Sequence, residues 1–396
     1  MNILKLVLSV LLLYSSSSFA ADEIHWTIMG QTAVTFDWRG SSSEDSISYG
    51  TKSGEYSKKV TAYTPKPRPY SSSGPFWEAK ITGLKENTRY YYSISNGSEA
   101  TFKTPPPRGS SGYTIVAEGD IGDTGTYFEV GAVQDMVADQ KPEFVLVLGD
   151  LAYGDQHGDE AVDQHFNDLM VWSRDAAFMP VWGNHEWGDS DDDLRNYKGR
   201  FDLPNSQASP NAPSNGCCGE DWFWFDYGNV RYIGVPEPYS RAWSDWQKKA
   251  AVLMAEAQSD SDITFIVTMV HRAAYSSGSH SGSLSLKERL DELGDDYSKY
   301  ALNLNGHSHN YERSHPQHGV VHVTAGGSGS SLGDKGSCLW YTCKQPSWSA
   351  YRAMHLGVLK LDISANGIAG TYYCGPASKG ENDVHCDIGD VMDKFS

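Results

Sequence analysis

The chain of 396 residues has a formal net charge of -18, and 39% of its residues are hydrophobic and 12% aromatic. This apolar and aromatic content excludes an intrinsically disordered chain. The acid excess argues against a nucleic-acid scaffold, which needs an extended basic surface. The length exceeds what one hydrophobic core usually serves, so we expect two domains.

Residues 1–20 have the features of a secretory signal peptide. One basic residue, Lys5, precedes a mostly apolar run at 6–14, and small residues follow as far as Ala20. The run is shorter than the roughly 20 residues of a membrane span. We expect cleavage after Ala20, a secreted or periplasmic protein and no membrane span. The alternatives are an apolar first strand and an interfacial anchor.

All the cysteines follow this segment, so they would be exported with the mature chain. They are Cys217, Cys218, Cys338, Cys343, Cys374 and Cys386. An even number in an oxidising compartment favours disulfides. Short spacings favour the pairs Cys338–Cys343 and Cys374–Cys386. A zinc site is the alternative, although no Cys-x-x-Cys spacing is present.

Residues 22–105 have the pattern of an all-β domain. Apolar and polar residues alternate over 33–38 and 90–94, and clusters of Gly, Ser and Asn separate such segments. Short alternating strands with turns at this spacing favour a β-sandwich. The proline run 105–107 is a stiff linker, and we expect the second domain at 112–396.

Short apolar runs in the second domain end in polar loops that often contain glycine. The runs are 113–117, 144–148, 179–182, 263–269 and 301–304. They fit buried strands, and residues 247–258 and 284–293 have helical patterns. In open α/β sheets, ligands bind beyond the carboxyl ends of the strands. The loops are therefore the expected functional site.

These loops supply a set of candidate metal ligands. Oxygen donors are Asp120, Asp150, Asn184 and Tyr153, and nitrogen donors are His271, His307 and His309. Seven donors are too many for one tetrahedral ion and suit two ions that share a carboxylate. Two adjacent metal ions favour in-line displacement at phosphorus.

Five sequence blocks resemble those of the purple acid phosphatases, in the calcineurin-like metallophosphoesterase superfamily. They are Gly-Asp-Ile-Gly at 119–122, Gly-Asp-Leu-Ala-Tyr at 149–153, Gly-Asn-His-Glu at 183–186, His271, and Gly-His-Ser-His-Asn-Tyr-Glu-Arg at 306–313. Their order and spacing match, and the corner at 83–90 resembles a fibronectin type III domain. The resemblance implies an all-β fibronectin III-like sandwich followed by an α/β four-layer metallophosphoesterase sandwich.

The resemblance also assigns the ligands. Fe(III) would occupy a first site formed by Asp120, Asp150, Tyr153 and His309, and Asp150 would bridge the two ions. Divalent Fe, Zn or Mn would occupy a second site completed by Asn184, His271 and His307. The histidines His185 and His280 would face the substrate, bind phosphate oxygens and protonate the leaving group.

Some positions depart from the family pattern or have no assigned role. Thr268 replaces the usual apolar residue, Pro-Glu-Pro at 236–238 replaces an acidic-threonine pattern, and His280 lies in a Ser/Gly-rich segment. We expect Glu186 to be a supporting or surface residue, and Tyr311 and Arg313 to brace the last loop. Glu118 and the remaining histidines have no predicted catalytic role.

The sequence therefore predicts a secreted, binuclear metal-dependent acid phosphatase. It would hydrolyse small phosphate monoesters by attack of a metal-bound hydroxide. Two alternatives stay open: a phosphodiesterase or nucleotide-directed phosphohydrolase on the same site, and a secreted binding module with a degenerate metal site. The sequence makes no prediction of oligomeric state.

Overall fold

The computed structural model describes most of the chain. The described residues are 21–40, 43–69, 74–187, 196–210, 219–238, 241–332, 344–378 and 384–396. The predicted signal peptide 1–20 lies outside them, as do Cys217, Cys218, Cys338 and Cys343. Among the described residues, no helix combines the length and apolar character that crossing a membrane requires.

The N-terminal part is a β-sandwich of two antiparallel sheets. One sheet has the order β1 (Asp22–Gly30), β2 (Ala33–Arg39), β5 (Phe76–Ile81), and the other has the order β4 (Lys58–Thr61), β3 (Ser46–Gly50), β6 (Arg89–Ile94), β7 (Ala100–Lys103). The alternating side chains face inward, where Phe36 and Phe102 pack with ring centroids 5.3 Å apart. This aromatic core explains the period-two pattern of the sequence.

The second part contains two mixed sheets. The first has the order β10 (Ala177–Val181), β9 (Phe144–Leu148), β8 (Tyr113–Glu118), β18 (Gly357–Ile363), β19 (Ile368–Cys374), β20 (Val391–Phe395). The second has the order β11 (Trp224–Tyr227), β12 (Val230–Gly234), β13 (Phe265–Val270), β14 (Tyr300–Asn305), β16 (Val321–Ala325), β15 (Tyr311–Ser314), β17 (Ser349–Ala353). Strands β8 to β10 are parallel to one another, as are β12, β13, β14 and β16.

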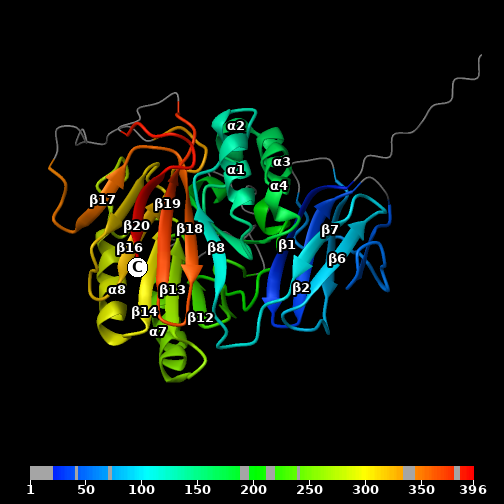
Figure 1. Cartoon of the computed structure of the whole chain (residues 1–396), viewed down its shortest axis with the longest axis horizontal. Coiled ribbons are helices and arrows are strands. Elements are labelled where there is room, and N and C mark those ends of the chain that lie inside the picture. Colours follow the sequence, from blue (N-terminus) through cyan, green and yellow to red (C-terminus); the bar gives the residue numbers. More distant parts are fainter. Residues whose placement is uncertain are drawn as a thin grey trace, which may run out of the picture.

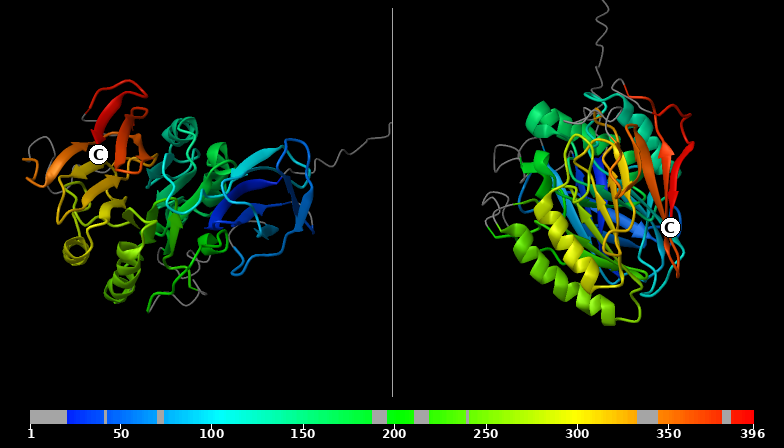
Figure 2. Two further views of the ribbon diagram at one scale, coloured as in Figure 1. Left: turned by 60° about the horizontal axis from the view of Figure 1, so that its bottom comes forward. Right: turned by 90° about the vertical axis from the view of Figure 1, so that its left-hand side faces the viewer.

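Helices flank these sheets or lie in the loops between their strands. They are α1 (Glu129–Asp139), α2 (Gly154–His157), α3 (Asp159–Asp168), α4 (Met170–Ser173), α5 (Asn184–Trp187), α7 (Ala242–Ser259) and α8 (Leu284–Asp296). Helix α1 contacts β18 of one sheet and α8 contacts β14 of the other. Figure 2 shows α7 and α8 together on one side of the stacked sheets. This is the predicted α/β sandwich, and both predicted helices are confirmed, with α7 beginning at Ala242.

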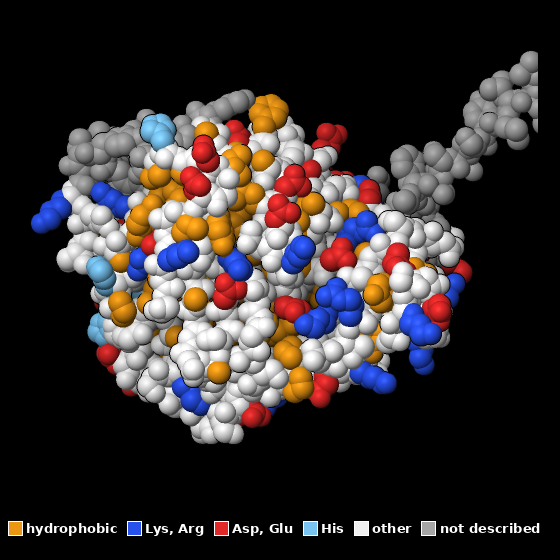
Figure 3. Space-filling view, viewed as in Figure 1, with side chains coloured by type: hydrophobic (Ala, Val, Ile, Leu, Met, Phe, Trp, Pro, Cys, Tyr) orange, Lys and Arg blue, Asp and Glu red, His pale blue; other side chains and the backbone are white. Residues whose placement is uncertain are grey.

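The β-sandwich lies against the helices of the first sheet (Figure 1), where α3 and α4 contact β1. Ion pairs join the two parts, because Arg200 Nε lies 3.0 Å from the buried Glu23 Oε2 and Arg39 Nη1 pairs with Asp163 Oδ2. The ring of His25 is buried between the carbonyls of Glu23 and Arg200. His25 therefore packs between the two parts of the chain. On the face in Figure 3, Lys and Arg side chains are interspersed with Asp and Glu.

Several carboxyl groups are buried or half-buried where the two parts meet. Burial and the nearby carboxylates Glu78 and Asp202 raise the pKa of Asp37, whose oxygens have no hydrogen-bond partner among the described residues. Burial raises the pKa of Glu220 to about 8, despite the hydrogen bond that its side chain accepts from Leu203 N. These groups are neutral in the folded protein at mildly acidic pH and ionise on unfolding.

The contribution of these groups to stability should therefore fall as pH rises. An acid whose pKa is raised by folding binds its proton more tightly in the native state, so its contribution is complete below its unfolded pKa of about 4.5 and is lost as pH passes its folded pKa. Each such group contributes a slope of at most about 1.4 kcal/mol per pH unit. Thermal unfolding can be followed between roughly pH 5 and pH 8. Tm should fall with pH, and Glu220→Gln should flatten this dependence.

The control for this prediction is Glu288→Gln, because Glu288 is an exposed residue on α8. The control should keep the wild-type slope. A Glu220→Gln protein whose pH dependence is as steep as wild type would contradict the burial argument.

Candidate metal centre

The carboxyl ends of strands from both sheets bring together the seven side chains predicted as metal ligands. Asp120 follows β8, Asp150 and Tyr153 follow β9, Asn184 begins α5 after β10, His271 follows β13, and His307 and His309 follow β14. Because parallel strands point their carboxyl ends the same way, these loops share one edge of each sheet.

One group of donors lies around Asp120. His309 Nε2 is 3.3 Å from Asp120 Oδ1 and 3.0 Å from the Tyr153 hydroxyl, which is 3.5 Å from Asp120 Oδ1. Asp120, Asp150 and His309 present atoms that all lie within 4.8 Å of one another. Such spacing is compact enough for one cation to contact them together.

A second group lies around His271. Its Nε2 is 3.1 Å from Asp150 Oδ2, 3.2 Å from Asn184 Oδ1 and 3.1 Å from His307 Nδ1. Asp150, His271 and His307 also present atoms within 4.8 Å of one another. Asp150 belongs to both groups, so its carboxylate lies where a bridging ligand is needed.

The imidazole rings are oriented by backbone carbonyls. His271 Nδ1 is 2.8 Å from Leu148 O, and His309 Nδ1 is 2.6 Å from Ser331 O. A hydrogen bond from Nδ1 to a carbonyl leaves the Nε2 lone pair directed at the carboxylates. This second interaction is the usual way in which proteins fix a ligating histidine.

The electrostatics of the cluster favour cations. Burial disfavours a charge on His271, but the Asp150 carboxylate outweighs burial and raises the pKa of His271 to about 10. Burial also opposes ionisation of Asp150, yet His271 holds the Asp150 pKa below its usual range. Without metal, a proton therefore occupies the space between these donors. The donor chemistry, the spacing and this negative field all fit two metal ions.

The backbone of the cluster is strained. Asp120, Asp150, Tyr153 and His307 have φ values of 58°, 50°, 56° and 69°, in the left-handed region that non-glycine residues rarely adopt. Such conformations concentrate at functional sites because the surrounding structure must stabilise them. The strain falls on four of the seven predicted ligands.

Glycines of the sequence blocks make room for the donors. A Cβ on Gly183 would overlap Asp150 Oδ1, and one on Gly306 would lie 2.5 Å from Asp120 Oδ2. Glu186 supports the same loops, because its buried carboxylate accepts hydrogen bonds from the backbone N–H groups of Asp150, Leu151 and Gly183. Glu186 is thus a buried supporting residue rather than a surface residue.

Comparison with known families identifies the architecture. The family model described as calcineurin-like phosphoesterase matches residues 113–311, and that of the purple acid phosphatase N-terminal domain matches residues 21–107. The chain belongs to the purple acid phosphatases. It is therefore a metal-dependent phosphatase, and the family implies a binuclear metal centre.

The chain is similar over most of its length to curated phosphatases. Purple acid phosphatase 22 of Arabidopsis thaliana is 26% identical over 332 residues, covering 78% of this chain and 72% of the relative. Phosphoenolpyruvate phosphatase of Allium cepa is 24% identical, covering 80% and 70%. The structure of the yellow lupin purple acid phosphatase PPD1 superposes with a TM-score of 0.74 at 20% identity, covering 95% of this chain and 74% of that chain.

The two histidines that the sequence predicts to face the substrate border the cluster. His185 Nδ1 lies 2.8 Å from Asp155 Oδ2, and its ring centroid is 4.6 Å from that of Tyr153. The ring of His280 stacks on His307 with centroids 4.1 Å apart. Both predicted residues thus lie beside the donors, one on each group.

Three further residues support the cluster or its histidines, and the sequence did not predict a role for them. Arg272 Nη1 lies 3.2 Å from His307 Nε2, and Arg272 Nε donates a 2.9 Å hydrogen bond to the buried Glu237. Asp155 orients His185. Arg272 could have been predicted from its position next to His271. Glu237 could not, because residues 236–238 depart from the family pattern.

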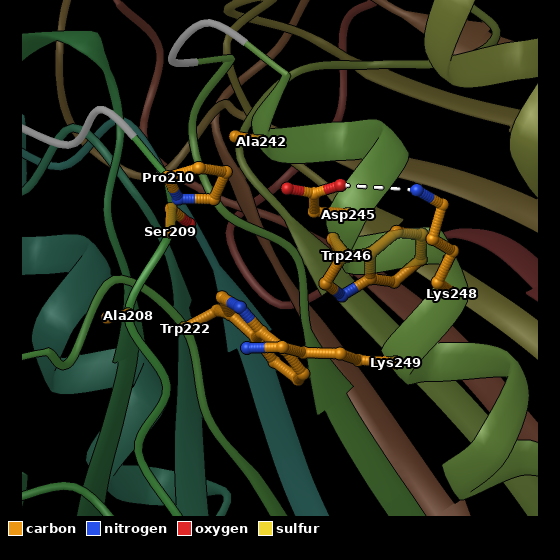
Figure 4. Close-up of a pocket in the computed structure, with 9 residues that line it drawn as sticks. All are labelled: Ala208, Ser209, Pro210, Trp222, Ala242, Asp245, Trp246, Lys248 and Lys249. Carbon is orange, nitrogen blue, oxygen red and sulfur yellow. Dashed lines mark hydrogen bonds and ion pairs between the residues drawn. The ribbon is translucent and has the colours of Figure 1, made fainter.

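A hollow lies at the start of α7, away from the donor cluster. Its volume is about 230 Å³, and it is lined by Ala208, Ser209, Pro210, Trp222, Ala242, Asp245, Trp246, Lys248 and Lys249. Figure 4 shows Asp245 paired with Lys248 there and Lys249 lying by the ring of Trp222. It shares no residue with the donor cluster.

The shared carboxylate gives the sharpest test of the cluster. Asp150→Ala should lose most of both metals, since Asp150 belongs to both groups, and activity should fall at least about 1,000-fold, as expected when metal chemistry at phosphorus is removed. Elemental analysis of the purified protein measures this. The surface variant Asp295→Ala is the control and should retain wild-type metal. Full metal content in Asp150→Ala would refute the shared role.

Proposed function

We propose that this chain is a secreted, binuclear acid phosphatase that hydrolyses phosphate monoesters. The observation that carries the proposal is the pair of donor groups that share Asp150. Two metal ions bound a few ångströms apart are suited to in-line displacement at phosphorus. The family and the strained strand-end loops give further support.

The donor chemistry favours a different ion in each group. The group of Asp120, Asp150, Tyr153 and His309 is rich in hard anionic oxygen, which suits Fe(III). The group completed by Asn184, His271 and His307 offers imidazole and amide, which suit divalent Fe, Zn or Mn. When bound, the ions would polarise the phosphoryl group and lower the pKa of water.

The remaining residues of the site would bind and protonate the substrate. Asp155 fixes the Nδ1 side of His185, so His185 Nε2 is the nitrogen that can give a proton to the leaving oxygen. Its Nε2 lies 3.8 Å from Asp150 Oδ2. His280, stacked on His307, lies at the other group. General acids placed in this way typically contribute about 100- to 10,000-fold.

Arg272 favours monoesters over diesters. Its guanidinium is fixed by Glu237, lies beside His307 and is 27% exposed in its side chain, so it can contact a bound anion. A monoester has an additional negative oxygen that a diester has replaced by an ester group. A charge-assisted bond from Arg272 to that oxygen would stabilise only the monoester.

Two features support secretion. Residues 1–20 have the signal-peptide pattern. The predicted disulfide Cys374–Cys386 is present, with Cα atoms 6.3 Å apart. Disulfides persist in oxidising compartments outside the cytosol. We infer cleavage after Ala20 and a role for the mature chain in the periplasm or outside the cell.

The proposal is tested by comparing p-nitrophenyl phosphate with bis(p-nitrophenyl) phosphate after reconstitution with iron and zinc or manganese. The monoester should have the higher kcat/KM. Arg272→Ala should reduce kcat/KM for the monoester about 10- to 100-fold, the value of one charge-assisted hydrogen bond, and change the diester much less.

Arg272→Lys serves as the matched control, because it keeps the charge and should recover part of the loss. Dominant diesterase activity would reject the monoester assignment. Absence of activity together with absence of bound metal would instead favour the binding-module alternative. Equal losses for both esters in Arg272→Ala would reject the role of Arg272.

A further inference from the structure

A second cluster of metal-binding side chains lies at the C-terminal end of the chain. Cys374 ends β19, Cys386 precedes β20, and His355 precedes β18. The two cysteines form a disulfide, and His355 Nε2 lies 3.9 Å from the Sγ atom of each. His355 is buried. The chain therefore places one imidazole against both sulfurs.

While the disulfide is intact, the described residues offer the two ring nitrogens of His355 only one oxygen partner. Its Nδ1 lies 2.8 Å from the carbonyl of Leu356, so the proton is on Nδ1 and Nε2 keeps a lone pair. The disulfide sulfurs both lie 3.9 Å from Nε2, and that of Cys374 is also 3.9 Å from Nδ1, but they carry no hydrogen to donate. The opposite tautomer would place a bare Nδ1 against the carbonyl oxygen. In either tautomer, one ring nitrogen meets no protein donor or acceptor other than sulfur among the described residues.

Once the S–S bond is broken and the sulfurs separate, the same three side chains suit a thiophilic metal ion. Cys374, Cys386 and His355 present atoms that lie within 4.8 Å of one another. In a tetrahedral zinc site the separation of a sulfur and a nitrogen ligand is about 3.6 Å, from the usual metal–ligand distances. The observed 3.9 Å is close to this value. An Nδ1–carbonyl bond is also the common orienting interaction of a histidine that binds metal through Nε2.

An open hollow gives access to these side chains and a source for a fourth ligand. Its volume is about 470 Å³, and both His355 and Cys386 line it. His385, next to Cys386 in the sequence, lines the same hollow and is exposed, as are Asp387 and Asp390. A cation can enter from this side without crossing the protein.

We propose that reduction of the Cys374–Cys386 disulfide creates a Zn²⁺ site formed by both sulfurs and His355, with His385 as the fourth ligand. A dithiol reductant supplies two electrons and two protons to the sulfurs and is itself oxidised to a disulfide. Zn²⁺ then displaces the two thiol protons as the thiolates bind. The cysteine content alone left a zinc site as the alternative to disulfides. In this proposal, the disulfide and the zinc site are two redox states of the same two cysteines.

This site is separate from the phosphatase centre. It shares none of the seven predicted ligands, and its donors include sulfur, which that centre lacks. Cobalt therefore distinguishes the two, because only thiolate ligands give an intense sulfur-to-cobalt charge-transfer band. The proposal does not depend on the phosphatase reaction, so the two can fail independently.

The experiment uses the full-length chain, reduced with dithiothreitol, freed of it under anaerobic conditions and titrated with Co²⁺. The double variant Cys374→Ser/Cys386→Ser is the matched control, since it keeps the other four cysteines. Reduced wild type should show thiolate–cobalt absorption from one more ion per chain than the reduced double variant. Oxidised wild type should show none of this difference.

The variant His355→Gln tests the third ligand. It should weaken cobalt binding in the reduced protein about tenfold or more, as loss of a ligand or its support does. Its phosphatase activity in the oxidised form, compared with wild type, checks that it folds. Equal thiolate–cobalt absorption in wild type and the double variant would overturn the proposal. So would unchanged cobalt affinity in a folded His355→Gln protein.

Discussion

The burial of two neighbouring carboxylates, Asp120 and Asp150, is the constraint on which the rest of this structure depends. An ionised carboxylate without a partner is very costly in a protein interior. Here both are surrounded by imidazoles, and His271 holds a proton against Asp150 when no metal is present. Metal cations would replace that proton and neutralise both groups. Because five strand ends from two sheets supply the surrounding donors, the metal charge also joins the two sheets at this edge.

Residues that take no part in the reaction hold the metal-binding side chains in position at this edge. The left-handed backbone of Asp120, Asp150, Tyr153 and His307 is unfavourable by itself, at about 1–3 kcal/mol for each residue. Glu186 offsets some of this cost by binding three backbone N–H groups of the Asp150 and Gly183 loops. These supports are buried, and a change in any of them should act through the position of the donors.

The sequence predicted those features that depend on short segments. The blocks around Asp120 and Asp150 identified strand ends, residues 247–258 and 284–293 are helical, and the short spacing of Cys374 and Cys386 indicated their disulfide. Contacts between distant segments were not predictable. Glu237 meets Arg272 only because β12 and β13 are neighbours, and Arg200 meets Glu23 only because the β-sandwich packs on the second domain. Asp155 was near Tyr153 in sequence, yet its role depends on where His185 lies.

The measurement that most directly tests the central claim is the metal content and visible spectrum of purified protein, with Tyr153→Phe measured beside wild type. The account predicts two metal ions per chain and a visible band from the Tyr153 phenolate on Fe(III), which Tyr153→Phe removes while retaining metal. Protein without stoichiometric metal after reconstitution, or an identical visible band in wild type and Tyr153→Phe, would contradict it.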